Sequence, residues 1–154
     1  TVLRLDYRSP NVFDECVADV LGACSFLRGV GASDVVLVGH SFGGAVVIRA
    51  GQLAPVVRGV AALASQRFGT QEVEELRVPL LLVHGTADTV LSPEASEDIY
   101  RRAGEAKRLV LFADAGHSLV DATAEIEALL CTWIPDRLAG RPDMSGREEV
   151  ELLR

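Results

Sequence analysis

The stretch VVLVGHSFGG, from Val35 to Gly44, decides the fold of this chain. Its first four residues are an apolar run that predicts a buried strand, and a helical pattern follows from the serine to about Leu53. Between them stands a G-x-S-x-G sequence, whose glycines allow the close approach that a sharp strand-to-helix turn requires. The serine of such a turn adopts a strained backbone, which raises its hydroxyl above the sheet. The stretch therefore predicts Ser41 as a nucleophile.

Two neighbours of Ser41 have different predicted roles. The backbone N–H of Phe42 lies at the positive end of the following helix, so we expect it to bind the oxyanion that forms during acyl transfer. His40 precedes Ser41 directly, and its side chain is expected to point away from the hydroxyl. We therefore interpret His40 as a structural residue and expect the base elsewhere.

Apolar runs short enough to form buried strands recur along the chain. They are Val2–Leu5, Val35–Val38, Val57–Leu63, Leu80–Val83 and Leu109–Phe112. Helical patterns separate them, and this alternation predicts an α/β fold with three α/β/α layers around a mostly parallel sheet. The predicted helices are one from Val12 to Leu27 capped by Asn11, one from Ser41 to Leu53, one started by Ser92, Pro93 and Glu94, and one started by Ser118 with Asp121 completing a capping box.

Candidates for the acid and the base follow two of the later strands. A serine hydroxyl becomes a good nucleophile when an imidazole takes its proton and a carboxylate holds the imidazole tautomer. Asp88 stands in the loop after Leu80–Val83, and His117 stands in the loop after Leu109–Phe112. The carboxyl ends of parallel strands meet at one edge of a sheet, where ligands bind in open α/β folds. We therefore expect Ser41, Asp88 and His117 to form a catalytic triad.

Other carboxylates compete with Asp88 for the role of the acid. Asp114 is only three residues from His117, which leaves little chain for it to reach round and orient the ring. Asp121 is better placed as a helix cap, and the glutamates between positions 72 and 75 form a solvated acidic run. The alternative interpretations are a turn residue for Asp88 and an ordinary loop histidine for His117.

Taken together, these segments resemble the α/β-hydrolase superfamily over residues 1–136. The resemblance rests on Leu3–Arg8, Gly39–Gly44, His84–Asp88 followed by Pro93, and Gly116–His117. The chain is most similar to small capless esterases of the dienelactone-hydrolase-like and serine-aminopeptidase-like branches, because the stretch between Ser41 and Asp88 is too short for a cap domain. The resemblance implies a serine hydrolase that cleaves a carboxylic ester, or a thioester or small amide, through an acyl-enzyme on Ser41 and without a cofactor or metal.

The two ends of the chain depart from that resemblance. Leu3–Arg8 is similar to the fourth strand of the superfamily and its exit loop, so the earlier strands and a second oxyanion donor are expected to be missing. Because the chain begins with Thr1, we interpret it as a truncated hydrolase, unless its first strand has moved inward or another chain fills the gap. A sheet left unpaired beside Val35–Val38 is expected to associate with itself. Residues 137–154 are expected to form a charged, mobile tail, or a short helix around Glu148–Leu153.

The composition limits the possible partners. A chain of 154 residues with 49% hydrophobic residues is expected to form one domain. Its formal net charge of −7, without a basic cluster, argues against nucleic acid, and no apolar run reaches the roughly 18 residues of a membrane span. No signal peptide is visible. Cys16, Cys24 and Cys131 lack metal-ligand spacing, so we interpret them as small buried hydrophobes of a cytoplasmic protein.

Two functions from different classes remain open at this point. The first is hydrolysis of a small ester-like substrate by the triad. The second is a non-catalytic α/β-hydrolase-like domain that binds a ligand or partner, or an inactive fragment of a longer hydrolase. A complete triad argues for the first function, and the missing front of the fold argues for the second.

Overall fold

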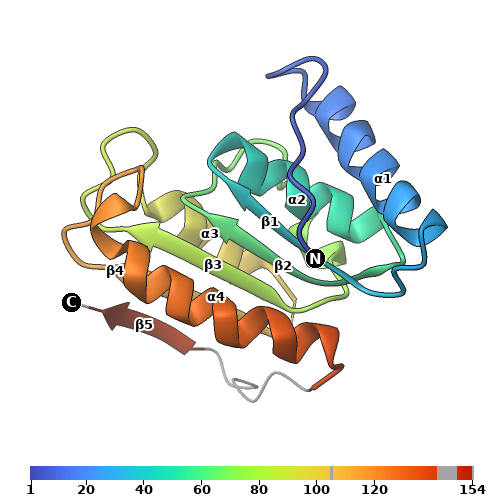
Figure 1. The fold of residues 1–154 in the computed structure, drawn as a ribbon. Helices are drawn as coiled ribbons and strands as arrows, with labels where there is room; N and C mark the ends of the chain where they lie inside the picture. The colour runs from blue at the N-terminus through green and yellow to red at the C-terminus, as the bar shows by residue number, and fades with distance from the viewer. Residues whose placement is uncertain (105, 142–148, 154) are drawn as a thin grey trace.

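A parallel sheet forms the centre of the molecule (Figure 1). The structure is a computed structural model that describes residues 1–104, 106–141 and 149–153, and within them the sheet has five strands. These are β1 (Val35–His40), β2 (Val57–Leu63), β3 (Leu80–Gly85), β4 (Lys107–Phe112) and β5 (Glu149–Leu153). Each strand pairs in parallel with the next in chain order. All the carboxyl ends therefore lie at one edge of the sheet.

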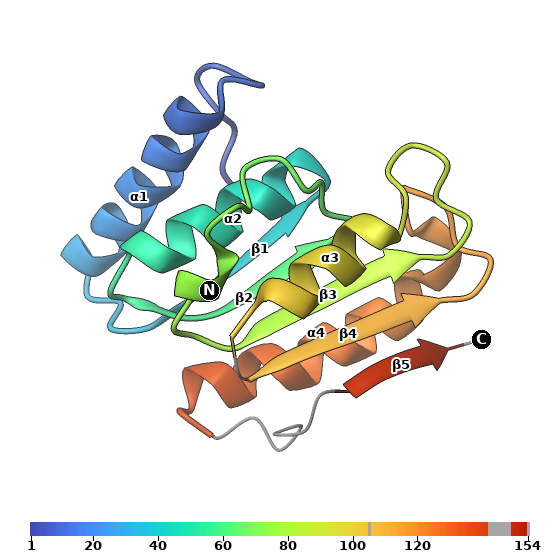
Figure 2. The ribbon, with the colours of Figure 1, turned by 180° about the vertical axis from the view of Figure 1, so that it is seen from behind.

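Helices cover both faces of this sheet (Figures 1 and 2). They are α1 (Phe13–Gly29), α2 (Phe42–Leu53), α3 (Glu94–Arg102) and α4 (Thr123–Leu138), with two short 3-10 helices, η1 (Val73–Glu75) and η2 (Val120–Ala122). On one face α2 and α3 contact the strands and α1 packs against α2, whereas α4 lies on the opposite face. These layers confirm the predicted α/β fold. In the described part of the chain, no helix is long and apolar enough to cross a membrane.

Two apolar cores, one on each face of the sheet, hold the layers together. Strand β3 is buried along its whole length. Leu80 and Leu82 belong to the core under α2 and α3, and Leu81 and Val83 belong to the core under α4. Full burial of one such side chain stabilises the fold by about 1.5–3 kcal/mol. The alternation along β3 therefore fixes its register, and with it the place where its exit loop leaves the sheet.

The cysteines follow the prediction only in part. Cys16 and Cys24 are buried in the core beside α2, as small hydrophobes would be. Cys131 is exposed, because it lies on the outward side of α4, while Ile126 and Trp133 of the same helix face the sheet.

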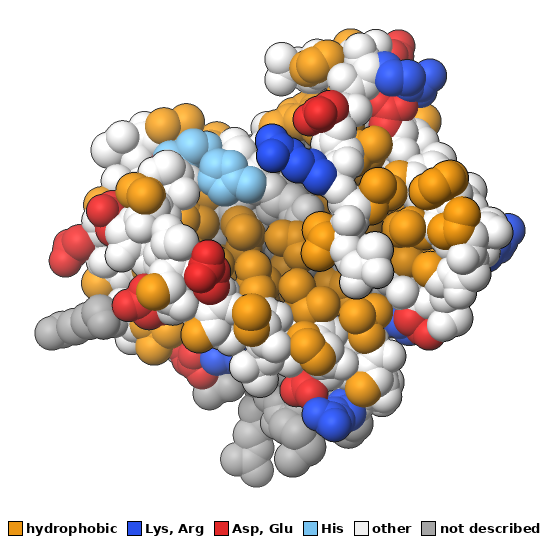
Figure 3. Space-filling model, in the orientation of Figure 1, with side chains coloured by type: hydrophobic (Ala, Val, Ile, Leu, Met, Phe, Trp, Pro, Cys, Tyr) orange, Lys and Arg blue, Asp and Glu red, His pale blue; other side chains and the backbone are white. Residues whose placement is uncertain are grey.

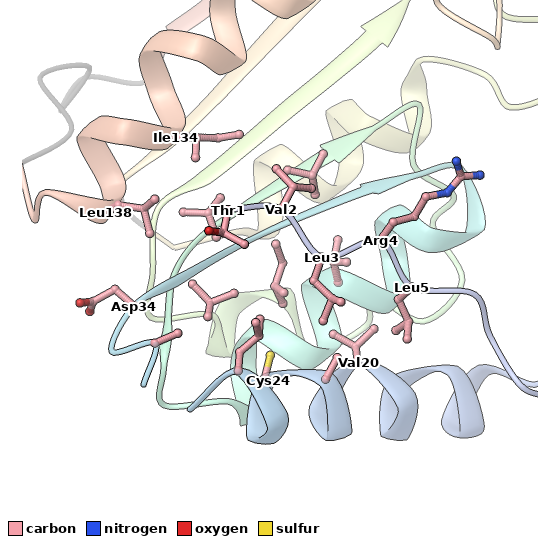
Figure 4. A pocket seen from close by; sticks show the side chains of 18 of the residues that line it. Thr1, Val2, Leu3, Arg4, Leu5, Val20, Cys24, Asp34, Ile134 and Leu138 are labelled. Carbon is pink, nitrogen blue, oxygen red and sulfur yellow. The ribbon is translucent and has the colours of Figure 1, made fainter. Parts of the chain in front are cut away.

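The N-terminal segment differs from the prediction. Val2–Leu5 forms no strand, and Val2 is 93% exposed. The segment and β1 instead both line an apolar groove of about 710 Å³, which α1 and the end of α4 close (Figures 3 and 4). The backbone of the segment does not form with β1 the ladder that neighbouring strands about 4.8 Å apart share. Strand β1 is therefore the edge of the described sheet, and the first strand has not moved inward to pair with it.

The C-terminal residues form a strand where a mobile tail or a short helix was expected. The N–H of Ala113 donates to the carbonyl of Leu153 over 2.8 Å, and Arg108 of β4 forms an ion pair with Glu151 at 2.6 Å. Glutamate and apolar residues alternate along β5, a period of two that suits an edge strand. Residues 142–148 and 154 of the expected tail lie outside the described residues.

The predicted start of the last helix is also wrong. A helix from Ser118 cannot form, because Leu119 adopts the left-handed backbone, with a φ of 57°. The short helix η2 follows, and α4 begins only at Thr123 without a capping side chain. Ser118 and Asp121 therefore do not form a capping box.

The other two predicted caps are replaced by backbone interactions. Helix α1 begins at Phe13, and Asn11 takes a φ of 69° and does not cap it. Helix α3 begins at Glu94, as Pro93 and Glu94 suggested, but Ser92 contributes its carbonyl, which accepts the N–H of Ala95 over 2.9 Å. In both cases the helix position was predicted well and the capping atoms were not.

The outer edge of β1 offers a direct test of this topology. Along a strand, alternate residues direct their N–H groups to opposite sides. Val35 and Ser41 donate toward β2, to the carbonyls of Val56 and Leu63. By alternation, Leu37 and Gly39 share their direction. The backbone N–H groups of Val36 and Val38 are therefore directed to the open edge of the sheet.

We expect the backbone amides of Val36 and Val38 to exchange with solvent at least about tenfold faster than those of Leu37 and Gly39, because no strand of the described residues pairs with them. Hydrogen exchange measured by NMR gives the four rates, and Leu82 in the centre of the sheet serves as the protected control. Equal, slow exchange of all four amides would mean that the edge is paired.

Candidate active site

Ser41 occupies a sharp turn between β1 and α2. Its backbone has a φ of 57° and a ψ of −120°, a strained conformation for a residue other than glycine. The turn is held from both sides, because the Ser41 N–H donates to the Leu63 carbonyl over 2.8 Å and its own carbonyl accepts the Gly44 N–H over 3.0 Å. A Cβ on Gly39 would overlap the carbonyl of Gly43. The turn therefore requires its first glycine, and it directs Ser41 away from the core.

His117 meets Ser41 from the loop that follows β4. Its Nε2 lies 2.9 Å from the Ser41 Oγ, which is a hydrogen-bond distance. The loop packs closely on the end of β3, since a Cβ on Gly85 would overlap the carbonyl of Ala115. His40 also holds the loop: its Nε2–H donates to the backbone carbonyl of His117 over 2.8 Å, and the two rings lie 4.9 Å apart. His40 is thus a structural residue, as the sequence predicted, with the His117 loop as its partner.

Asp88 completes the arrangement from the loop after β3. Its Oδ2 lies 2.7 Å from the Nδ1 of His117, and its side chain is fully buried. The Oδ1 accepts the backbone N–H groups of Val90 and Leu91, each over 2.8 Å. Burial raises the pKa of Asp88, but the N–H of Leu91, the His117 ring and the N–H of Val90 together hold it below its usual value. Asp88 is therefore a carboxylate, which keeps the proton of His117 on Nδ1 and leaves Nε2 free to accept the proton of Ser41.

The structure thus brings the three predicted residues together. It places Asp88 against the His117 ring, while the rival Asp114 uses its backbone N–H to bind Thr86 Oγ1 and Asp121 lies in η2. In the part of the chain that is described, no group of three or more His, Cys, Asp or Glu side chains could hold a metal ion.

The predicted oxyanion donor, Phe42, is the first residue of α2. Its N–H has no acceptor within the helix, because the first turn of a helix lacks preceding carbonyls. The Phe42 ring contacts the rings of Tyr7 and Phe13 edge to face, at centroid distances of 6.2 and 6.1 Å, and Phe13 contacts Phe68 at 5.8 Å. We call these four rings the aromatic cluster. It forms an apolar wall at the start of α2, beside Ser41.

His84 is a residue of the site that the sequence did not predict. Its ring is fully buried at the end of β3, and its Nε2 lies 3.0 Å from the Asp88 Oδ2. The chain offered one signal: His84 precedes Asp88 by four residues at the end of a buried strand. The other contacts of the ring involve residues that a linear pattern does not connect to it.

Comparison with known proteins gives two partial family matches. The "Alpha/beta hydrolase family" model matches residues 1–73, and the "Serine aminopeptidase, S33" model matches residues 59–123. A curated relative, the uncharacterized protein YfhR of Escherichia coli (strain K12), is 46% identical over 48 residues. That stretch is 31% of this chain and 16% of the relative, so the chain matches a small part of the relative's length.

Solved structures share the fold over most of this chain. The esterase domain of a Rhodothermus marinus protein superposes with a TM-score of 0.75 and 25% identity, over 88% of this chain and 72% of that one. Dienelactone hydrolase from Anabaena variabilis superposes with a TM-score of 0.74 and 21% identity, over 80% of this chain and 60% of the dienelactone hydrolase chain. Monoacylglycerol lipase from Paleococcus ferrophilus superposes with a TM-score of 0.70 and 17% identity, over 79% of this chain and 76% of the lipase chain. The two family models, matched in succession along the chain, and the esterase domain at 25% identity together support a member of the α/β-hydrolase superfamily.

Proposed function

We propose that this chain is a serine hydrolase that cleaves carboxylic esters through an acyl-enzyme on Ser41. The observation that carries the proposal is the unbroken hydrogen-bonded path from the Ser41 Oγ through His117 to the buried Asp88 carboxylate. The similarity to an esterase domain at 25% identity supports the same class of reaction. Members of the superfamily act on many different substrates, so membership alone does not identify the substrate. We propose an ester on the basis of the chemistry of the site.

The proposed reaction passes two protons in turn through His117, one in each half of the cycle. The Ser41 oxygen attacks the ester carbonyl while the His117 Nε2 takes the hydroxyl proton, and Asp88 stabilises the resulting imidazolium. The Phe42 N–H donates to the carbonyl oxygen as it becomes negative. His117 then gives its proton to the alcohol that leaves, and the acyl group stays on Ser41. Water then attacks the acyl carbonyl while His117 takes one of its protons. The bond between the acyl carbon and the Ser41 oxygen breaks, His117 gives its proton to that oxygen, and the acid is released.

The aromatic cluster indicates which esters the site would accept. Phe68 is 66% exposed, and its ring extends the wall that Phe42 and Phe13 form beside Ser41. Such a wall favours an acyl or alcohol group that is apolar over one that carries a charge. Thioesters and small amides would follow the same steps, with a different leaving group.

A binding domain without catalysis is the competing candidate. The apolar groove of about 710 Å³ beside β1 favours it, because an open groove of this kind suits a bound molecule. The buried charge of Asp88 favours hydrolysis, since a binding domain has no need of a carboxylate aligned with a histidine and a serine. Reactivity of Ser41 distinguishes the two candidates.

Ser41 should react with a fluorophosphonate probe. The probe phosphonylates a serine that a histidine activates, so Ser41→Ala should remove labelling, whereas Ser118→Ala should label like the parent chain. Mass spectrometry of the labelled peptides identifies the serine. Labelling that persists in Ser41→Ala would assign the nucleophile to another residue, and a folded parent chain that never reacts would favour the binding domain.

Replacement of Asp88 should affect turnover far more than replacement of its rival. We expect Asp88→Asn to lower kcat by about 10⁴-fold, because an amide cannot hold the proton of His117 on Nδ1. Asp114→Asn is the matched control and should keep kcat within about twofold of the parent chain, since Asp114 does not contact the His117 ring in the way that Asp88 does. Kinetics with a p-nitrophenyl ester measures both variants. A larger loss in Asp114→Asn would show that the acid was wrongly assigned.

A further inference from the structure

His84 is a buried polar residue that the mechanism above does not use. Its side chain is fully buried, yet both ring nitrogens have partners. Nε2 lies 3.0 Å from the Asp88 Oδ2 and 2.9 Å from the carbonyl oxygen of Leu91, and Nδ1 lies 2.7 Å from the Ser96 Oγ. The ring therefore links the acid loop to helix α3.

These contacts determine where the proton of His84 lies. Nε2 faces a carboxylate and a carbonyl, and both groups can only accept hydrogen bonds. The proton is therefore on Nε2, which donates to Asp88 and Leu91 together. Nδ1 then accepts the hydroxyl hydrogen of Ser96. A neutral ring satisfies every contact, so His84 does not need to carry a charge in this buried position.

The Asp88 carboxylate receives its full set of donors only with His84 in place. Two backbone N–H groups bind its Oδ1, and the rings of His117 and His84 bind its Oδ2. A carboxylate offers about four acceptor sites, and here all four are filled. Loss of one donor would leave a fully buried charge partly unsatisfied at the oxygen that contacts His117.

We infer that His84 is a positioning residue, which holds the Asp88 Oδ2 in place for His117 by donating from Nε2. The inference rests on the proposed function for its catalytic meaning. His84 touches neither Ser41 nor the site where an ester would react, so it acts through Asp88 alone. It also donates to the Leu91 carbonyl, so the ring contacts both the carboxylate and a residue whose N–H binds that carboxylate.

Three variants separate this role from simple filling of space. His84→Leu fills the space of the imidazole ring and removes the N–H that donates to Asp88. His84→Gln returns an N–H donor at the end of a side chain of similar reach, and Ser96→Ala removes a hydrogen bond from the far side of the ring while the donor to Asp88 remains. The last variant is the matched control, because it alters the same buried cluster without touching Asp88.

We expect His84→Leu to lower kcat by about 10–100-fold with little change in KM, since a hydrogen bond to a charged group is lost. His84→Gln should recover most of that loss, and Ser96→Ala should stay within about threefold of the parent chain. Titration of active sites corrects each rate for misfolded protein. Equal rates for His84→Leu and His84→Gln, or an equal loss in Ser96→Ala, would reduce His84 to a packing residue.

NMR of chains with ¹⁵N-labelled histidine tests the inference without any turnover. In the parent chain, His84 should be neutral with its proton on Nε2, and the Nδ1 proton of His117 should change its resonance in His84→Leu but not in Ser96→Ala. A proton on Nδ1 of His84 would overturn the inference. Because this result does not depend on hydrolysis, an inactive chain with the expected spectra would contradict the proposed function alone.

Discussion

The arrangement of the site depends on one close approach of backbone to backbone. Where β1 turns into α2, Gly39 lies so near the carbonyl of Gly43 that no side chain fits between them. The strained backbone of Ser41 costs about 1–3 kcal/mol, a conformation that persists only when its surroundings enforce it. Helix α2 does so, because Val46 and Ile48 are fully buried and each contributes about 1.5–3 kcal/mol. Ser41 is thus held by the packing of the core behind it.

The parallel sheet then determines which distant residues reach Ser41. Strands β1, β3 and β4 end at the same edge, so their exit loops bring Ser41, Asp88 and His117 within hydrogen-bond distance although they are far apart in the chain. Gly85 allows the His117 loop to pack on the end of β3. The buried charge of Asp88 would be costly alone, and its four donors are what make it tolerable.

Much of this arrangement follows from local sequence. The β1 strand, the turn at Ser41 and the loops that carry Asp88 and His117 were predictable, because buried parallel strands are continuous apolar runs and the turn needs its glycines. The absence of a strand at Val2–Leu5 was not predictable, since an apolar run becomes a strand only if a neighbouring strand pairs with it. Strand β5 likewise depends on β4, which lies far from it in the chain. The role of His84 depends on contacts with Ser96 and Leu91 that only the folded loop creates.

The most direct test of the account is detection of the acyl-enzyme. The chain is mixed with an excess of a short-chain p-nitrophenyl ester, quenched in acid within the first turnover and digested for mass spectrometry. We expect one acyl group per active chain, on the peptide that contains Ser41, and none on a His117→Ala chain treated in the same way. Release of p-nitrophenol with the acyl group on another residue, or with no acylated peptide at any quench time, would contradict a nucleophilic Ser41.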